Sequence, residues 1–202
     1  MDFEIKLIEF LQAGRNQFFD LSFQLISAIG SLVGVIGLCL FFLIYKRKML
    51  FWYLFSYGFV YLTVNALKHF IERPRPFNVT ESVLNIGDTV TGFSMPSGHA
   101  ACATAIAIFL GYFLWQVFNK KSIRVCVVVS CLIYVGLVCL SRMYLGKHYL
   151  TDVLAGVAIS AVFCIAGLVL MHFVQKNKRV KDENKNGSKW RKTNKGTCWC
   201  FR

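Results

Sequence analysis

Two histidines and an aspartate stand at the ends of long apolar segments, where polar residues are uncommon. His99 follows a Pro-Ser-Gly run, and His148 stands four residues before Asp152. Two histidines can divide the labour of phosphoryl transfer, because one can attack phosphorus while the other protonates the leaving oxygen. If a helix has begun at His148, the spacing of four places Asp152 on the same face. The carboxylate can then orient one imidazole nitrogen and leave the other as the nucleophile.

Cations and backbone donors accompany these residues in the sequence. Lys68, Arg75 and Arg142 can neutralise the charged oxygens of a transferring phosphoryl group, and arginine binds such oxygens through two parallel hydrogen bonds. Ser97 and Gly98 open an apolar segment, so their backbone N–H groups stand at a helix N-terminus that favours phosphate. Gly98 also lets the backbone approach a ligand closely. The combination favours phosphoryl-transfer chemistry.

Each of these features alone has a simpler interpretation. A Lys or Arg at the end of a membrane span usually reaches for the headgroups, a Pro-Ser-Gly run usually starts a helix, and a single histidine usually makes a structural hydrogen bond. Metal ligation is the alternative for the two histidines, but a set of two histidines and one aspartate amid three cations suits a dication poorly. The sequence therefore predicts a site with no metal and no cofactor.

The elements that must position these residues are membrane helices. Of the 202 residues, 56% are hydrophobic, and the mean hydropathy is +0.53. The apolar residues form blocks long enough to cross a bilayer core of about 30 Å at about 1.5 Å per residue. We predict five spans, the fourth of them short and extended by a turn at each end: 21–45, 50–70, 100–118, 125–140 and 153–174.

The first twenty residues have a different pattern. Polar residues recur at steps of three or four between apolar ones: Asp2, Lys6, Glu9, Gln12, Asn16 and Asp20. This pattern is typical of an amphipathic helix lying in the membrane interface, and the mixed charge of the segment is unlike that of a secretory signal peptide. A disordered segment and a sixth span are the alternatives. The predicted fold class is all-α, an integral membrane bundle of about five spans plus this interfacial helix.

The basic residues predict the orientation of the bundle. The net charge is +13, and residues 175–202 carry ten Lys or Arg and two acids, a net of +8. Beside a membrane span, such a tail is a solvated anchor against anionic lipid rather than a nucleic-acid-binding segment, so no nucleic-acid partner is predicted. Two more basic clusters, at 46–48 and 120–124, follow the first and third spans. The positive-inside rule makes these clusters and the tail cytoplasmic, which places the polar site on the opposite side.

Cys198 and Cys200 either carry acyl chains or belong to a plain basic tail.

The three polar segments resemble the signature of the type 2 phosphatidic acid phosphatase (PAP2) superfamily, which includes vanadium haloperoxidases and bacterial acid phosphatases. That signature reads K-x6-RP, PSGH and SR-x5-H-x3-D. Residues 68–76, 96–99 and 141–152 match all eleven fixed positions in order. A second Arg-Pro pair, Arg73-Pro74, follows Lys68 by a spacing of four instead of six, so Arg75 is the better assignment.

The resemblance implies roles for individual residues. It implies His148 as the nucleophile that forms a phosphohistidine, His99 as the general acid and Asp152 as the residue that orients His148. It implies the following phosphate ligands: Lys68, Arg75, Ser97, Gly98 and Arg142. On this basis residues 1–174 form the phosphatase domain, with the interfacial helix in 1–20, and residues 175–202 form the cytoplasmic tail.

The substrate is expected to be a lipid phosphate. Soluble relatives would not need five spans, and a site at the end of a helix bundle can accept a substrate whose tail stays in the bilayer. The compact chain resembles bacterial members that act on undecaprenyl pyrophosphate, phosphatidylglycerophosphate or phosphatidic acid. Our first expectation is conversion of undecaprenyl pyrophosphate to undecaprenyl phosphate at the outer face of the plasma membrane.

Two hypotheses from other classes remain at this point. A phosphotransferase would pass the phosphoryl group to an acceptor other than water, and transfer of a radiolabel to an alcohol would reveal it. A membrane scaffold without activity is disfavoured by the intact His99, His148 and Asp152.

Overall fold

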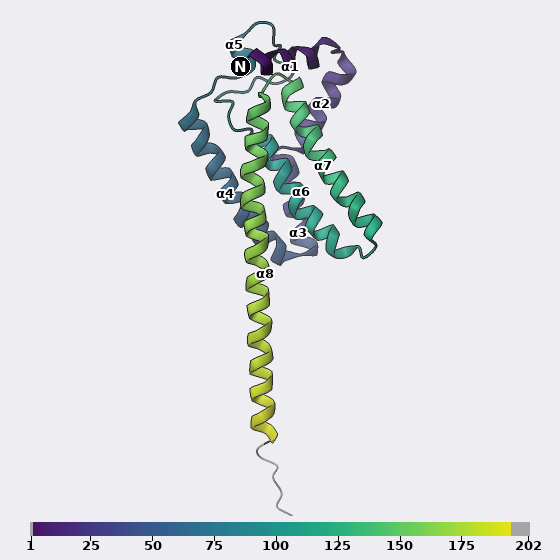
Figure 1. Cartoon of the computed structure of the whole chain (residues 1–202), viewed down its shortest axis with the longest axis vertical. Coiled ribbons are helices and arrows are strands. Elements are labelled where there is room, and N and C mark those ends of the chain that lie inside the picture. Colours follow the sequence, from purple (N-terminus) through teal and green to yellow (C-terminus); the bar gives the residue numbers. More distant parts are fainter. Residues whose placement is uncertain (1, 195–202) are drawn as a thin grey trace, which may run out of the picture.

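The computed structural model describes residues 2–194, without the side chains of 179 and 182–194, and the described residues form helices and no strands (Figure 1). The predicted all-α class is therefore confirmed. The helices are α1 (Asp2–Ala13), α2 (Gln17–Ile29), α3 (Leu32–Tyr45), α4 (Arg47–Ile71), α5 (Pro76–Val79), α6 (Gly98–Val117), α7 (Lys121–Tyr144) and α8 (Leu150–Asn194).

Four of the five predicted spans are single helices, because α4, α6, α7 and α8 are each long and apolar enough to cross a bilayer. The remaining predicted span consists of α2 and α3, which are bent by 45° at the break between them and count as a fifth span if the pair crosses as one. The fourth predicted span extends at both ends to become α7. Helix α8 continues past the predicted end at 174 into the basic segment. Residues 195–202, with Cys198 and Cys200, lie outside the described part of the chain.

The break between α2 and α3 was not predicted, because no charged residue and no proline interrupts residues 21–45. It occurs at Gly30 and Ser31, a pair of residue types at which helices commonly kink. The Ser31 hydroxyl accepts from the N–H of Val33 at 3.2 Å and donates to the Ala28 carbonyl at 2.5 Å. These bonds cap the new helix and satisfy the end of the old one. Hydrophobicity alone therefore locates the span but misses its bend.

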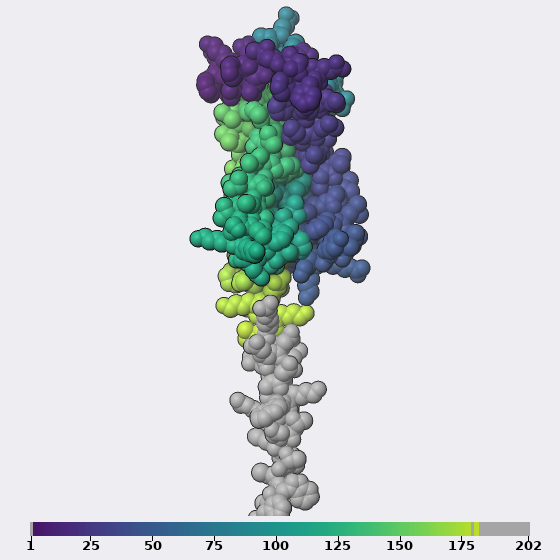
Figure 2. All heavy atoms as spheres, turned by 90° about the vertical axis from the view of Figure 1, so that its right-hand side faces the viewer, coloured from purple at the N-terminus to yellow at the C-terminus, as the bar shows by residue number. Residues whose placement is uncertain are grey.

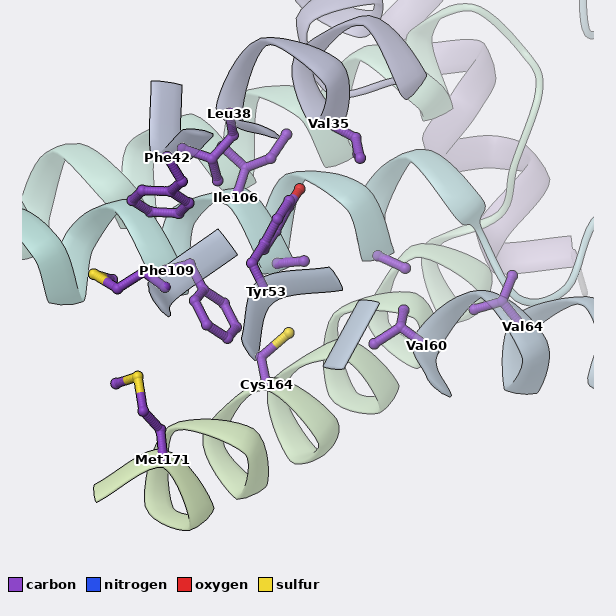
Figure 3. Close-up of a cluster of buried hydrophobic side chains, with 13 residues drawn as sticks. Val35, Leu38, Phe42, Tyr53, Val60, Val64, Ile106, Phe109, Cys164 and Met171 are labelled. Atoms are coloured by element: carbon purple, nitrogen blue, oxygen red, sulfur yellow. The ribbon is translucent and has the colours of Figure 1, made fainter. Parts of the chain in front are cut away.

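Helix α6 is the central helix of the bundle, because it packs against α7, α8, α4 and α3. Its inward positions are mostly alanines, and small residues let helices in a membrane approach closely. The largest core cluster lies between α3, α4, α6 and α8. The rings of Phe42, Tyr53 and Phe109 meet there edge to face, with Cys164 and Met171 of α8 beside them (Figure 3).

Helix α1 lies across one end of the bundle and, with α2, covers that end (Figures 1 and 2). At about 1.5 Å per residue its 12 residues reach about 18 Å, too short to span the bilayer core. Its protein-facing stripe is Glu4, Ile8 and Gln12, spaced by four, whereas Phe3 and Phe10 are 72% and 76% exposed. Gln12 was predicted on the polar, solvent-facing side, but it is buried. Its side chain bonds to Leu84 N–H and to two carbonyl oxygens, those of Leu84 and Tyr144.

Candidate active site

All eight predicted site residues lie at the end of the bundle that α1 covers. Helices α4 and α7 end there, and α6 and α8 begin there, so antiparallel neighbours bring distant parts of the sequence together. Lys68 lies in the last turn of α4, Arg75 just before α5, and Arg142 in the last turn of α7. Ser97 caps α6, and Asp152 is in the first turn of α8.

His148 precedes α8 rather than lying in it, because the helix begins at Leu150. The ring still faces Asp152, and the distance from Nδ1 to Oδ2 is 3.7 Å, longer than a direct hydrogen bond. Ser94 fills the space between them. Its hydroxyl donates to Asp152 Oδ2 at 2.5 Å and lies 3.4 Å from His148 Nδ1. Because Nδ1 of His148 faces Ser94 and Asp152, Nε2 is the ring nitrogen that points away from the carboxylate.

The environment keeps His148 neutral. Burial lowers the pKa of the imidazole, and the nearby cations Arg142, Arg75 and Lys68 lower it further against the opposing effect of Asp152, to about 3. A neutral imidazole retains the lone pair that a nucleophile needs. The same three cations that the sequence singled out therefore act on one histidine.

Asp152 is fully buried and makes more contacts than its predicted partnership with His148. Its Oδ2 also accepts from the N–H of Tyr149 at 2.9 Å, and its Oδ1 accepts from Arg73 Nη1 at 2.7 Å. Both oxygens are thus engaged by side chains and backbone of the protein. Among the side chains that the structure describes, no group of three or more His, Cys, Asp or Glu is placed to share a metal ion.

Lys68 and Arg75 hold the loop before α6. Lys68 Nζ donates to the Phe93 carbonyl at 2.8 Å, and Arg75 donates to the Gly92 carbonyl at 2.9 Å from Nε and to the Lys147 carbonyl at 3.1 Å from Nη1. Gly92 has a φ of +80°, which other residues rarely adopt. Arg75, only 4% exposed, therefore connects the loop to the backbone next to His148.

Arg142 is also 4% exposed, and its guanidinium is only partly satisfied. Nη1 donates to the Ser27 hydroxyl of α2 at 2.6 Å, whereas Nε has no acceptor among the described residues. A buried donor without a partner is costly. An oxygen of a bound phosphate would remove that cost, so this observation fits an anion site.

The start of α6 is held tightly against α8. The N–H of Ser97 donates to the Asp152 carbonyl at 2.9 Å, and the Ser97 hydroxyl accepts from the N–H of Ala100 at 3.5 Å. A Cβ on Gly156 of α8 would stand 2.4 Å from the Ser97 carbonyl oxygen, so only glycine permits this approach. The backbone N–H that we expected Ser97 to offer to phosphate is already used, which leaves its hydroxyl hydrogen for that purpose.

His99 and Gly98 open into a cavity of about 240 Å³ between α3, α4 and α6. One face of α4 lines this cavity, with Lys68 at the end next to His99. The remaining lining is largely apolar or aromatic and includes Tyr57, Val60, Tyr61, Val64 and Leu32. The polar site is thus continuous with a mostly apolar pocket that enters the bundle.

Sequence reasoning missed Ser94 and Glu4, whereas Arg73 and Lys147 stood out only as basic residues that violate the charge rule at this end and received no role. Arg73 was set aside as a phosphate ligand, and the structure joins it to Asp152 and Glu4 instead. Lys147 is 2% exposed and donates to Asn85 and to the Asp88 carbonyl, and burial followed by the charges of Arg142 and Arg75 lowers its pKa to about 8. No spacing rule pointed to Ser94.

Comparison with known proteins gives consistent matches. A family model described as "PAP2 superfamily" matches residues 49–179, more than half of the chain. Sphingosine-1-phosphate phosphatase 2 from Homo sapiens is 30% identical, over 75% of this chain and 37% of its own length. Phosphatidylglycerophosphatase B from Bacillus subtilis is 33% identical, over 60% of this chain and 54% of its own length.

The fold also has a solved counterpart. The crystal structure of a transmembrane PAP2-type phosphatidylglycerolphosphate phosphatase from Bacillus subtilis has a TM-score of 0.73 at 23% identity, covering 87% of this chain and 86% of that one. The chain spans about a third to about half of the length of the two curated relatives. The matched residues 49–179 include all three motifs, whereas α1, α2 and α3 lie outside them.

Proposed function

Because this chain belongs to the PAP2 superfamily, we propose that it is a membrane phosphatase that hydrolyses the phosphate of a lipid through a phosphohistidine intermediate. The observation that carries the proposal is the grouping of buried cations around a buried, neutral histidine. Arg75 and Arg142 are each 4% exposed, His148 is 2% exposed, and Arg142 Nε lacks an acceptor among the described residues. Such a grouping is costly to bury unless an anion occupies it.

The proposed reaction has two steps that share one set of groups. Nε2 of His148 attacks phosphorus, the bond from phosphorus to the leaving oxygen breaks, and His99 gives that oxygen a proton. Asp152, acting on the Nδ1 side, stabilises the positive charge that develops on the His148 ring. Water then attacks the phosphohistidine while His99 takes a proton from it. Inorganic phosphate leaves, and His148 is regenerated.

The phosphate ligands in this proposal surround the transferring group. Lys68, Arg75 and Arg142 counter the charge on the three equatorial oxygens, which is where charge resides in such a transition state. The Ser97 hydroxyl and the N–H of Gly98 add donors at the start of α6. The carbonyl oxygens of residues 92 and 93 now accept from two of the cations, so these contacts are shared or exchanged when phosphate enters.

A lipid substrate is supported by the cavity that joins the site. Its lining by Tyr57, Val60 and Val64 is suited to the first part of an apolar chain, and Lys68 and His99 stand at the phosphate end. Our first proposal for the lipid is undecaprenyl pyrophosphate, converted to undecaprenyl phosphate. The second candidate is phosphatidylglycerophosphate, which is favoured by the curated relative and the solved structure whose names include that activity.

The proposed orientation follows from the basic residues. Residues 46–48, 120–124 and 175–194 lie at the end of the bundle away from the site, so the positive-inside rule makes that end cytoplasmic. The site then faces the extracytoplasmic side of the plasma membrane. We assign residues 1–174 to the phosphatase domain and 175–202 to a cytoplasmic tail.

The test is release of phosphate from a panel of lipid phosphates by the purified protein in detergent. The panel includes undecaprenyl pyrophosphate, phosphatidylglycerophosphate and phosphatidic acid, and the substrate with the highest kcat/KM identifies the lipid. We expect His148→Ala to abolish release without changing expression. Turnover by His148→Ala at the wild-type rate would rule out the mechanism.

Two added reagents, vanadate and EDTA, test the mechanism in the same assay. Vanadate is expected to inhibit, because its trigonal bipyramid resembles the transition state. EDTA is expected to have no effect. A loss of activity in EDTA that added divalent ions restore would contradict a site that works without metal.

A further inference from the structure

Arg73 makes a set of contacts that phosphate binding does not explain. Its Nη1 donates to Asp152 Oδ1 at 2.7 Å and to the Thr151 hydroxyl at 2.6 Å, and its Nη2 donates to Glu4 Oε2 at 2.7 Å. The guanidinium lies 3.9 Å over the ring of Tyr149, a cation–π contact. Arg73 is therefore held on three sides and directed at the carboxylate that faces His148.

Glu4 completes this arrangement from α1. Its second oxygen accepts from the N–H and the hydroxyl of Thr151, each at 2.8 Å. Partial burial raises the pKa of the Glu4 carboxyl, but the bonds from Thr151 and Arg73 outweigh this effect and hold the pKa below its ordinary value. The side chains of Glu4 and Arg73 are only 13% and 16% exposed, so solvent screens the pair weakly.

We propose that Glu4 and Arg73 are positioning residues for Asp152, which makes the N-terminal helix α1 a part of the catalytic machinery. Ion pairs and hydrogen bonds connect Glu4 to Arg73, Arg73 to Asp152, Asp152 to Ser94 and Ser94 to His148. This inference rests on the proposed function. It goes beyond the family pattern, because Glu4 lies outside the matched residues 49–179.

The physical reason is that a carboxylate rotates easily about its last side-chain torsion, for which the preferred angles are broad. Arg73 fixes Oδ1, so Oδ2 must face Ser94 and the His148 ring. Without Arg73 the buried carboxylate would rotate among its remaining donors, and His148 would lose the orientation that directs Nε2 to phosphorus. Glu4 prevents Arg73 from turning outward, where its charge would be solvated.

A purely structural role is the alternative, in which the Glu4–Arg73 pair only fastens α1 to the bundle. Ile8 and Gln12 already fasten α1, since Ile8 is fully buried and Gln12 bonds to Leu84 and Tyr144. A positioning role and a fastening role differ in the kinetics. Loss of positioning lowers kcat with little change in KM, whereas loss of fastening lowers the fraction of folded enzyme.

The experiment compares Glu4→Gln, Arg73→Lys and the double variant with Arg15→Gln as the control. Arg15 belongs to a more exposed ion pair with Asp20, at 3.1 Å, that does not contact Asp152. Glutamine keeps the shape of Glu4 and an acceptor for Thr151 but removes the charge. We expect kcat to fall roughly 10- to 100-fold in each single variant, by analogy with the residues that orient metal-binding histidines through a hydrogen bond. We expect the double variant to lose less than the product of the two effects.

Two further readouts decide the interpretation. The inhibition constant of inorganic phosphate is expected to stay within about twofold of wild type, because the phosphate ligands are untouched, and the melting temperature in detergent is expected to follow the Arg15→Gln control. Wild-type kcat in Glu4→Gln would overturn the inference and leave the phosphatase proposal intact. A loss that parallels unfolding would also overturn it. An inactive wild type would instead reject the proposed function.

A second observation lies at the opposite end of the bundle. A cavity of about 490 Å³ is lined by residues of the α3–α4 turn, the last turns of α6 and the middle of α8: Lys46, Lys48, Met49, Tyr112, Gln116, Met171, Gln175 and Lys178. The lining includes three lysines and no acidic residue. Met49 and Met171 are buried beneath it. An adjoining cavity of about 390 Å³ shares three of these residues and adds the rings of Phe51 and Trp52.

We propose that this cavity binds the headgroup of an anionic phospholipid. Three ammonium groups, two at the start of α4 and one on α8, can meet one phosphate, and the amides and the phenol can bond to the oxygens that remain. Helix α4 begins here with Lys46 as its N-cap, and Lys46 gives no side-chain cap, so the N-terminal end of that helix adds to the positive potential. The neighbouring aromatic cavity accommodates the acyl chain. Basic pockets between membrane helices bind lipid headgroups in this way.

The test compares the double variant Lys46→Gln/Lys48→Gln with the double variant Lys120→Gln/Lys121→Gln. The second pair removes the same charge at the same end of the bundle but does not line the cavity. Retention of added phosphatidylglycerol is measured by native mass spectrometry, with phosphatidylcholine as the uncharged comparison. At about fivefold per lysine, we expect at least tenfold weaker retention in the first variant only.

Three outcomes would overturn this second proposal. Wild-type retention by both variants would mean that the cavity lysines do not hold the lipid. Equal loss in both would mean that the lysines act only through the general surface potential. Displacement of the lipid by millimolar inorganic phosphate would mean that the site takes free phosphate rather than a lipid.

Discussion

Ser94 has a single hydrogen to donate, and it is committed to Asp152 Oδ2 at 2.5 Å. The lone pairs of its oxygen then face His148 Nδ1, so the serine can relay the orientation that the carboxylate imposes. We expect Ser94→Ala to lower kcat by roughly tenfold at unchanged KM, which corresponds to about 1.4 kcal/mol of transition-state stabilisation. Steady-state kinetics on the best lipid substrate checks this.

The control for this prediction is Ser82→Ala, an exposed serine in the same connection between α4 and α6 that bonds only to Thr80. It is expected to behave as wild type. Full kcat in Ser94→Ala would mean that Asp152 orients His148 across 3.7 Å without help from Ser94.

The depressed pKa of His148 predicts how stability depends on pH. The folded protein holds this group at about 3, whereas an unfolded chain would hold it near 6.5. Between these values the unfolded chain binds a proton that the folded protein does not, so the free energy of unfolding falls as pH drops from about 6.5. Glu4 has a lowered pKa and contributes in the same direction at lower pH.

The measurement is the melting temperature in detergent between pH 7 and pH 4.5. We expect His148→Asn to flatten the dependence, because asparagine cannot take up the proton. An equally steep loss in that variant would assign the effect to titratable groups other than His148.

At the level of single residues, the sequence predicted which side chains form the candidate site but not the contacts among them. The spacing of His148 and Asp152 placed them in proximity, as found, although α8 begins only at Leu150. Ser94 and Glu4 escaped notice because the partners of their side chains are at least 53 and 69 residues away, respectively. Only folding brings such residues together, and an isolated serine or glutamate has no periodic pattern to mark it.

Among the helices, the close approach of α6 and α8 sets the geometry of the site. A methyl group at Gly156 would collide with the Ser97 carbonyl, so α6 would move away from α8. We expect Gly156→Ala to destabilise the fold by about 1–3 kcal/mol, as other overpacking substitutions do, and to lower kcat/KM. Gly136→Ala in α7 is the matched control, because a Cβ there has nothing within 4 Å.

The control variant Gly136→Ala has its own expected effect on stability. Alanine at an open helical position is favoured over glycine by up to about 1 kcal/mol, so Gly136→Ala should be neutral or slightly more stable. Thermal unfolding and activity of both variants check the pair. Equal behaviour of the two variants would contradict the assigned contact.

The elements themselves were predictable to the extent that hydrophobicity defines them. Long apolar runs gave the spans, since a run of that length has no alternative to a membrane helix in so short a chain. The bend at Gly30 and Ser31 was not predicted, because one glycine and one serine barely change the hydropathy of the run. Gln12 was placed on the wrong side of α1, since polarity alone does not distinguish a solvated amide from one that bonds to buried backbone.

Across the whole molecule, the candidate site and the basic clusters lie at opposite ends of the bundle. At the end that α1 covers (Figure 1), the cations Arg142, Arg75 and Lys68 act on His148, whereas the basic clusters from which we infer the orientation belong to the opposite end. The cations of the site violate the charge rule at their own end, which is expected if a bound phosphate neutralises them. A lipid phosphate can enter only from the leaflet that faces this end, so orientation determines which pool of substrate the enzyme meets.

Orientation can be measured in intact cells with a maleimide that does not cross the membrane. Single cysteines at Glu81 and at Lys120, both exposed and at opposite ends of the bundle, are placed in a background whose eight native cysteines are replaced by alanine. We expect Glu81→Cys to react from outside and Lys120→Cys to react only after lysis, while both variants keep phosphatase activity. The reverse labelling would turn the site toward the cytoplasm and exclude any substrate confined to the outer leaflet, so the undecaprenyl pyrophosphate proposal would fail with it.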